Sequence, residues 1–268
     1  MNGDLKRVLA ARIRHLDIPI FGIADADRWE GSQMTVGMPR DFHPRSIFPE
    51  CRSVIVFGYP IILPVIETTP SIQYHEMYRT VNSLLDQATY RVSLFLNQQG
   101  HASVPVTRDG YGSLDVLKER PIAFFSHKHA AYLAGLGTFG VNNNLLTEEF
   151  GPRVRFASIL TTAELPSDPV KEMELCIRCM RCVRKCPVQA LQPKDYPKAL
   201  TDKSRCTGYH ESLYKRHVSP CGICIKVCPV GEDRKLYGRT DLSIYEDESE
   251  PSEIHKAWDH VRSYGGKV

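Results

Sequence analysis

The chain has 268 residues, of which 42% are hydrophobic and 24% charged, with a formal net charge of +3 at pH 7. This balance permits a well-formed apolar core and excludes a chain that is disordered throughout. No stretch approaches the roughly 20 consecutive apolar residues of a membrane-spanning helix. The charged, amphipathic N-terminus lacks the apolar run of a signal peptide, so we expect a cytoplasmic protein without membrane contact.

Helices and strands are expected to alternate along the N-terminal half. Apolar residues three and four positions apart predict a helix over 5–16, followed by a strand over 20–26. The continuous apolar run 54–57 is typical of a strand that is covered on both faces. A long amphipathic helix is predicted from about residue 74 to 99, with Gly100 as its C-terminal stop.

The alternation continues beyond this helix. We expect a strand over 102–107, a loop over 108–113, a short helix that Ser126 caps, and a strand over 153–162. Alternating elements of this kind favour a layered α/β domain. The segment "PSDPVKE" predicts a linker, and Ser252 is expected to open a C-terminal helix. The resulting division is a first domain at 1–168, a cysteine-rich domain at 169–236, and a tail with a helix at 237–268.

Cysteines are concentrated in the second of these parts. Eight of the nine lie between Cys176 and Cys228, whereas Cys51 stands alone. In a cytoplasmic chain such clustering indicates metal or redox chemistry rather than disulfides. The stretch "CIRCMRCVRKCP" has the full C-x2-C-x2-C-x3-C-P spacing of an iron–sulfur ligand run, and "CGICIKVCP" is one cysteine short of it.

The missing ligand follows from the way such runs share cysteines. In proteins with two clusters, the fourth cysteine of a run ligates the other cluster. Applied twice, this rule predicts two 4Fe-4S clusters, with Cys206 completing the second. The first takes Cys176, Cys179, Cys182 and Cys228, and the second takes Cys186, Cys206, Cys221 and Cys224. Structural zinc is the alternative for the C-x2-C pairs, but it leaves the Cys-Pro endings unexplained. Cys51 is expected to be an ordinary buried thiol.

Positive charge accompanies the cysteines. Residues 176–235 contain 13 Lys and Arg against 5 Asp and Glu, a net charge of +8 (13 − 5), which leaves −5 (3 − 8) for the rest. A basic patch of this kind is one signature of nucleic-acid binding. The alternative, which we favour, is that it offsets the negative charge of two thiolate-ligated clusters.

The order of the longer motifs resembles one known family. "DFHPRSIFPECRSVIVFGYP", "HKHAAYLAGLGTFGVNNNLL" and "FGPRVRFASILTT", followed by the eight cysteines, resemble the epoxyqueuosine reductases, whose distant relatives are the reductive dehalogenases. The resemblance extends from about Leu5 to Cys228. It implies an α+β protein in which a nitroreductase-like α/β domain binds cobalamin and precedes a ferredoxin-like domain with two clusters. The clusters would then reduce the cobalt of the cobalamin.

The resemblance also implies cofactor-binding residues. The matching stretch contains Gly135, Leu136, Gly137, Gly140 and Asn144. Glycines suit such a position because backbone must approach a large flat ring closely. A nearby loop would face the same pocket through Arg108, Gly110 and Tyr111. The alternative is that these residues only form turns.

The proton donor is less well defined. Family members that act on tRNA usually carry an aspartate upstream of the "AGLG" motif, and the matching segment "PIAFFSHKHAA" has no carboxylate. Asp115 fits only with an insertion after it, and Tyr111, His127 and His129 are the other candidates. Val141 also replaces the lysine that is usual after the last glycine. Epoxyqueuosine in tRNA is therefore not the substrate we expect.

These observations predict an iron–sulfur reductase that passes electrons to cobalamin for reduction of a small or nucleoside-like substrate. The electron donor would be a low-potential protein such as ferredoxin or flavodoxin. One alternative is a non-catalytic corrinoid-binding or electron-transfer protein that carries or reduces cobalamin for a partner corrinoid protein. Another is that flavin replaces cobalamin, because a bare chain needs some cofactor to accept electrons.

Overall fold

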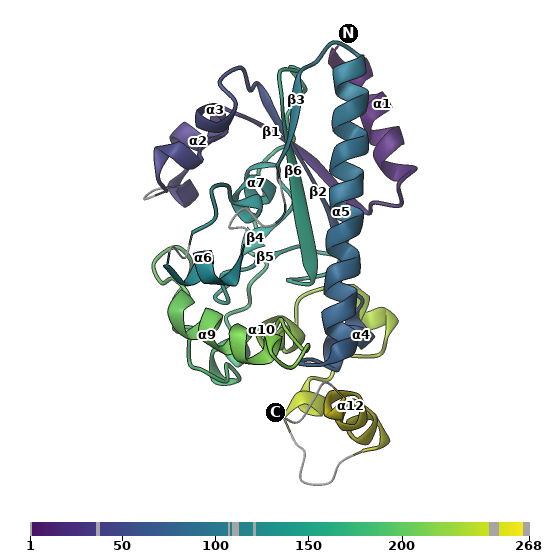
Figure 1. Cartoon of the computed structure of the whole chain (residues 1–268), viewed down its shortest axis with the longest axis vertical. Helices are drawn as coiled ribbons and strands as arrows, with labels where there is room; N and C mark the ends of the chain where they lie inside the picture. The colour runs from purple at the N-terminus through teal and green to yellow at the C-terminus, as the bar shows by residue number, and fades with distance from the viewer. Residues whose placement is uncertain are drawn as a thin grey trace.

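The computed structural model describes residues 2–35, 38–106, 108, 113–119, 122–246 and 252–264. Its centre is a four-stranded sheet with the strand order β1-β2-β6-β3 (Figure 1). The strands are β1 (Ile20–Asp25), β2 (Ser53–Pro60), β3 (Ser103–Val106) and β6 (Val154–Thr161). All three neighbouring pairs are antiparallel. The expected combination of helices with a sheet is confirmed.

The apolar run in β2 explains why the sheet is buried on both faces. The first six residues of this strand are buried, as the sequence predicted. Ile55 and Phe57 belong to the core beneath α1 (Asn2–Arg14) and α5 (Ile72–Gln98). Val54 and Val56 point to the opposite core, which contains Trp29 and α7 (His127–Leu133). Successive side chains of a strand alternate between its faces, so one continuous apolar run supplies both cores.

The predicted helices are present with well-defined ends. Ser71 accepts a hydrogen bond from the Tyr74 amide and opens α5, and Gly100 follows its end with a φ of +83°. A left-handed residue at this place is the usual terminator of a helix, and glycine adopts it without strain. Ser126 caps α7 and Ser252 caps α12 (Glu253–Ser263), as expected. No helix within the described ranges is long and apolar enough to span a bilayer.

Shorter elements complete the chain. The helices are α2 (Arg28–Gly31), α3 (Pro44–Ile47), α4 (Leu63–Glu67), α6 (Leu114–Glu119), α8 (Arg181–Arg184), α9 (Lys203–Tyr214), α10 (Ile223–Lys226) and α11 (Asp233–Leu236). A two-stranded hairpin of β4 (Thr138–Phe139) and β5 (Leu145–Leu146) lies between α7 and β6. The 3-10 turns are Gln33–Thr35, Arg40–Phe42 and Ser243–Tyr245.

The cysteine-rich part packs directly against the lower end of α5 and against α4 (Figure 1). The Thr69 hydroxyl donates to the Cys221 carbonyl, and a Cβ on Gly222 would meet the Tyr74 ring at 2.6 Å. The predicted linker is tied to the sheet through Asp168, whose carboxylate accepts from the Ile23 amide at 2.9 Å. These contacts fix the cysteine loops relative to the sheet. The predicted domain boundaries at residues 168 and 236 remain predictions.

Candidate functional site

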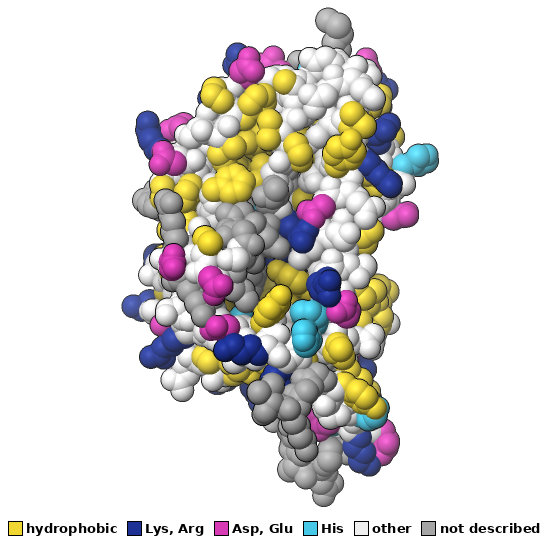
Figure 2. Space-filling view, in the orientation of Figure 1, with side chains coloured by type: hydrophobic (Ala, Val, Ile, Leu, Met, Phe, Trp, Pro, Cys, Tyr) yellow, Lys and Arg dark blue, Asp and Glu magenta, His cyan; other side chains and the backbone are white. Residues whose placement is uncertain are grey.

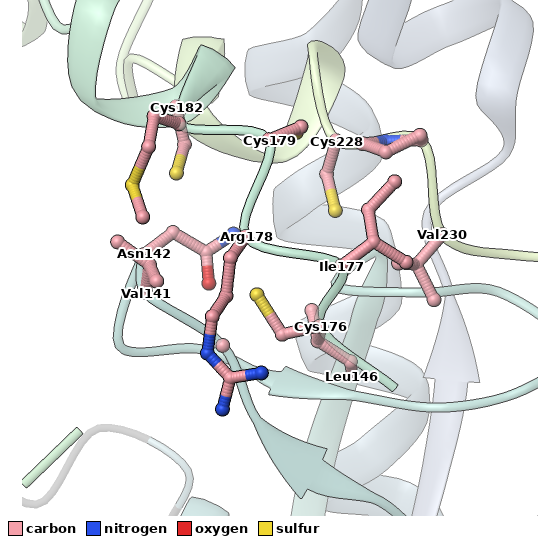
Figure 3. A pocket seen from close by; sticks show the side chains of 13 residues that line it. Val141, Asn142, Leu146, Cys176, Ile177, Arg178, Cys179, Cys182, Cys228 and Val230 are labelled. Atoms are coloured by element: carbon pink, nitrogen blue, oxygen red, sulfur yellow. The ribbon is translucent and has the colours of Figure 1, made fainter. Parts of the chain in front are cut away.

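The first set of cysteines surrounds a cavity. Cys176, Cys179 and Cys182 approach it from the linker and α8, and Cys228 approaches from the segment after α10. The cavity is small, and it is lined on the other side by Gly140, Val141, Asn142 and Leu146, among others. Figure 3 shows the sulfur atoms of Cys176, Cys182 and Cys228 directed toward the same space. Four thiols on one cavity are a donor set that suits an iron–sulfur cluster.

The pKa shifts of the cysteines in the first set also show that these thiols are neighbours. Burial is the largest cause that raises the pKa of Cys182 to about 12, and Cys228, Cys179 and Cys176 contribute to this rise. Burial likewise raises the pKa of Cys228 to about 11, against the opposing effects of the Val230 amide and of nearby arginines. Thiols that raise one another's pKa in this way repel as thiolates. Binding to iron removes that penalty, since a metal takes the thiolate form.

The second set also comes together, and it includes the isolated Cys206. This residue lies on α9, inside the insertion that separates the two motifs. Burial is the largest cause that raises the pKa of Cys221 to about 12, and Cys206 and Cys186 contribute to this rise. The pKa of Cys224 is raised by burial and then by Cys221, Cys206, Cys182 and Cys186. Cys186, Cys206, Cys221 and Cys224 are therefore electrostatic neighbours, with Cys182 also acting on Cys224, and their assignment to one cluster stays a prediction.

Backbone amides point at several of these sulfur atoms. The Ala190 amide donates to Cys186 Sγ at 3.2 Å, and the amides of Val183 and Ile223 lower the pKa of Cys182 and Cys221. Such bonds favour the thiolate and tune a bound cluster. Among the residues that the structure describes, no group of three or more His, Cys, Asp or Glu is arranged to hold a single metal ion. Cys51 is fully buried far upstream, as expected.

A hollow lies on the face between α5 and α6 (Figure 2). Lys128 of α7 has Lys203 and Arg155 as cationic neighbours, and Arg108 forms an ion pair with Asp86 of α5. Lys128 is exposed, yet burial is the largest cause that lowers its pKa to about 8, and Lys203 contributes to this decrease. A lysine can be reached by solvent and still have a lowered pKa when protein atoms surround it on most sides. Like charges gathered there suit an anionic group on a ligand.

An asparagine-rich turn connects this region with the second cysteine set. Asn144 Nδ2 lies 4.0 Å from Cys224 Sγ, and Asn142 Nδ2 donates to the Cys224 carbonyl at 3.5 Å. Lys128 Nζ donates to the Asn143 carbonyl at 2.8 Å. The predicted residue Asn144 is therefore in contact with a cysteine of the second set. Lys128 and Asn142 were not singled out from the sequence, although both lie in the quoted motif "HKHAAYLAGLGTFGVNNNLL".

The glycines of the predicted cofactor stretch pack tightly against the chain itself. A Cβ on Gly135 would lie 2.1 Å from the Pro169 carbonyl oxygen, and one on Gly137 would lie 1.9 Å from that of Leu146. Gly140 borders the first cysteine cavity, and the side chain of Leu136 packs with the core that contains Trp29. Close backbone packing accounts for the first two glycines, and their role in cofactor binding stays a prediction.

The other predicted residues are dispersed. Arg108 forms an ion pair with Asp86 of α5. His127 Nδ1 is 2.9 Å from the Ser158 hydroxyl of β6. Asp115 is exposed on α6, which packs against α9. Gly110 and Tyr111 lie outside the described residues.

His129 is held in an aromatic cluster. Its Nδ1 lies 2.6 Å from the Ser126 hydroxyl and its Nε2 lies 2.6 Å from the Tyr196 hydroxyl. Phe139 stacks on Tyr196 with a centroid distance of 4.2 Å. Burial lowers the pKa of His129 to about 4, with a smaller contribution from Lys128. The ring is therefore neutral at pH 7.

This pKa makes stability depend on pH. Because the folded-state pKa lies below the ordinary value of about 6.5, the unfolded chain binds more protons between these two values, and stability falls as the pH falls through them. Between pH 7 and pH 5 we expect His129 to account for about 2 kcal/mol of that loss. Thermal unfolding of His129→Gln at both pH values should show a smaller difference than the parent. An equal difference in the two proteins would contradict this prediction.

Comparisons with known proteins agree with the site. A family model described as "4Fe-4S dicluster domain" matches residues 175–232. The tetrachloroethene reductive dehalogenase of Desulfitobacterium hafniense is 29% identical over 197 residues, which are 66% of this chain and 32% of that protein. The epoxyqueuosine reductase of Synechocystis sp. is 26% identical over 208 residues, covering 71% and 66% of the two chains.

Solved structures show the same fold. A reductive dehalogenase for which B12-dependent dehalogenation is described has a TM-score of 0.67 at 19% identity, over 97% of this chain and 37% of that one. The epoxyqueuosine reductase from Streptococcus thermophilus has a TM-score of 0.58 at 16% identity, over 85% and 66%. This chain spans about a third of the length of the dehalogenases that it matches in sequence. The resemblance stated from the motifs is confirmed.

Proposed function

We propose that this chain, an epoxyqueuosine reductase-like protein related to the reductive dehalogenases, is an iron–sulfur reductase whose two clusters pass electrons to a cobalamin in the hollow. The observation that carries the proposal is the arrangement of the eight cysteines. We assign them to two sets of four, because the first four line one cavity and Cys224 of the others contacts the asparagine turn. The substrate would be small or nucleoside-like.

The direction of electron flow is proposed from the contact of the second set with the asparagine turn. The cysteines are buried or half-buried in both sets, and Ile177, between two cysteines of the first set, is 68% exposed. Cys224 of the second set touches Asn144, on the inner side. Electrons would therefore enter at the cluster of Cys176 and leave from the cluster of Cys224. A ferredoxin or flavodoxin is the class of donor we propose.

Positive charge near the hollow suits an anionic group of the cofactor. Lys128 and Arg108 supply positive charge that a phosphate of cobalamin would neutralise, and Asn144 would lie between the cofactor and the nearer cluster. A bound cobalamin would supply a cobalt centre that accepts single electrons. The chain's own contribution would be to bind this group and to exclude water around it.

Two alternatives differ in the cofactor or in the presence of catalysis. Flavin in the same hollow would accept the same electrons, and a corrinoid carrier would hold cobalamin without turning over a substrate. The hollow and the two cysteine sets are compatible with each alternative, so a direct binding test is needed.

The test is anaerobic incubation of cluster-loaded protein with either cob(II)alamin or flavin mononucleotide, followed by gel filtration. We expect cobalamin to remain with the protein in a saturable, one-to-one ratio, and flavin to be lost. Retention of flavin alone would replace cobalamin in the proposal. Retention of neither, with both clusters intact, would contradict a cofactor site in the hollow.

A further inference from the structure

Besides Lys226 of the motif itself, four charged side chains are buried beneath the second cysteine motif. Arg153 and Arg234 are 0% and 2% exposed, and Glu67 and Asp233 are 1% and 6% exposed. Removing a charge from water is costly unless an opposite charge or strong hydrogen bonds compensate it. The hydrogen-bond and ion-pair partners of each side chain therefore show which buried charges have an opposite charge beside them.

Three of these groups have charged partners. Arg153 forms a fork with Asp233, with Nη2 at 2.5 Å from Oδ1 and Nε at 3.3 Å from Oδ2. Glu67 Oε1 accepts from Arg239 Nε at 2.9 Å and from the Tyr245 hydroxyl. Each carboxylate is thus matched by its own arginine.

Arg234 differs because its partners are neutral oxygens. Nε donates to the Cys228 carbonyl at 2.8 Å, and Nη2 donates to the Lys226 carbonyl at 2.6 Å. Nη1 contacts the Tyr245 hydroxyl at 3.1 Å and the Arg239 carbonyl at 3.4 Å. None of the ion pairs formed between described residues includes Arg234. Its positive charge is buried directly behind a cysteine of the first set.

We infer that the compensating partner of Arg234 is the iron–sulfur cluster that Cys228 ligates, and that Arg234 raises the reduction potential of this cluster. The inference rests on the proposed function. A thiolate-ligated cluster carries net negative charge and gains one more negative charge on reduction. A buried cation nearby stabilises the reduced form more than the oxidised form, and burial limits screening by water and salt. Arg234 would therefore act on the cluster through its charge and not as a ligand.

The test is a redox titration of cluster-loaded protein, followed by EPR. In Arg234→Gln, which keeps a hydrogen-bonding group but loses the charge, we expect the reduced-to-oxidised ratio of one cluster at fixed potential to fall about tenfold. For a one-electron couple this equals about 59 mV. The other cluster should change less. Arg234→Lys, which keeps the charge, should stay within about twofold of the parent.

Arg184→Met is the matched control, because Arg184 donates to the Cys179 carbonyl at 3.1 Å but is exposed. We expect its ratio to remain within about twofold, since solvent screens an exposed charge. An unchanged ratio in Arg234→Gln with both cluster signals present would overturn the inference alone. Absence of cluster signals from the parent would instead overturn the proposed function.

If Arg234→Gln does not retain its clusters, Arg234→Lys decides the matter. A merely structural role predicts that lysine fails in the same way, because it cannot reproduce the fork to two carbonyls. Retained clusters with a parental ratio in the lysine variant would support the charge role. A tenfold shift or loss of clusters in the lysine variant would overturn it.

Discussion

Cys206→Ala is expected to lose one of the two clusters and to retain the other. Cys206 stands 15 residues before Cys221 in the chain, yet α9 brings it beside Cys186 and Cys221. Without its thiolate, the second set has three ligands instead of four. We therefore expect iron and sulfide content to fall by about half, or one cluster to be converted to a three-iron form.

Cys51→Ala is the control for this substitution. The Cys51 thiol is fully buried and lies in the core that contains Trp29, away from both cysteine sets. Iron content, sulfide content and both EPR signals should equal those of the parent. Full iron content in Cys206→Ala would contradict the assignment of Cys206 as a ligand.

The second prediction concerns the last cysteine of each motif, which we expect to ligate the cluster of the other motif. If each motif donates its last cysteine to the other cluster, Cys186→Ala and Cys206→Ala should lose the same EPR signal. Cys228→Ala should lose the other signal, because Cys228 lines the cavity with Cys176, Cys179 and Cys182. The change in each case is the near-complete loss of one reduced-cluster spectrum.

Uncrossed ligation predicts a different pattern. In that case Cys228→Ala and Cys206→Ala would lose the same signal, and Cys186→Ala would lose the other. Measuring the three variants side by side under the same reducing conditions separates the two patterns without knowledge of the substrate. The coupling of Cys182 to Cys228, and of Cys221 to Cys206 and Cys186, supports the crossed pattern.

The parts of the fold that depend on local pattern were predicted from the sequence. The buried run of β2, the serine caps of α7 and α12, and the glycine after α5 follow from neighbouring residues. The iron–sulfur character of residues 175–232 was also predicted, because the spacing of an iron–sulfur run is itself a local geometric constraint.

Features that depend on long-range packing were not predicted. The antiparallel order β1-β2-β6-β3 joins segments that are far apart in the chain, and an apolar run contains no information on strand direction. The fork between Arg153 and Asp233 and the burial of Arg234 likewise require residues of both motifs to meet. Sequence alone marks these residues only as charged, and charged residues are ordinarily exposed.

The residues near the proposed cofactor site were predicted only in part. Asn144 was predicted from the motif and touches Cys224, whereas Lys128 was overlooked beside the more conspicuous histidines His127 and His129. Their roles differ because α7 turns successive side chains toward different surroundings. Lys128 faces the open space, and His129 is enclosed by Phe139 and Tyr196.

The most direct test of the account is electron transfer from the clusters to cobalamin within one protein molecule. Both clusters would be reduced, excess reductant removed, and cob(II)alamin added anaerobically while EPR follows all three centres. The account predicts that the reduced-cluster signals and the cobalt(II) signal disappear together, with matching numbers of electrons. Cluster signals that persist beside an unchanged cobalt(II) signal would contradict it.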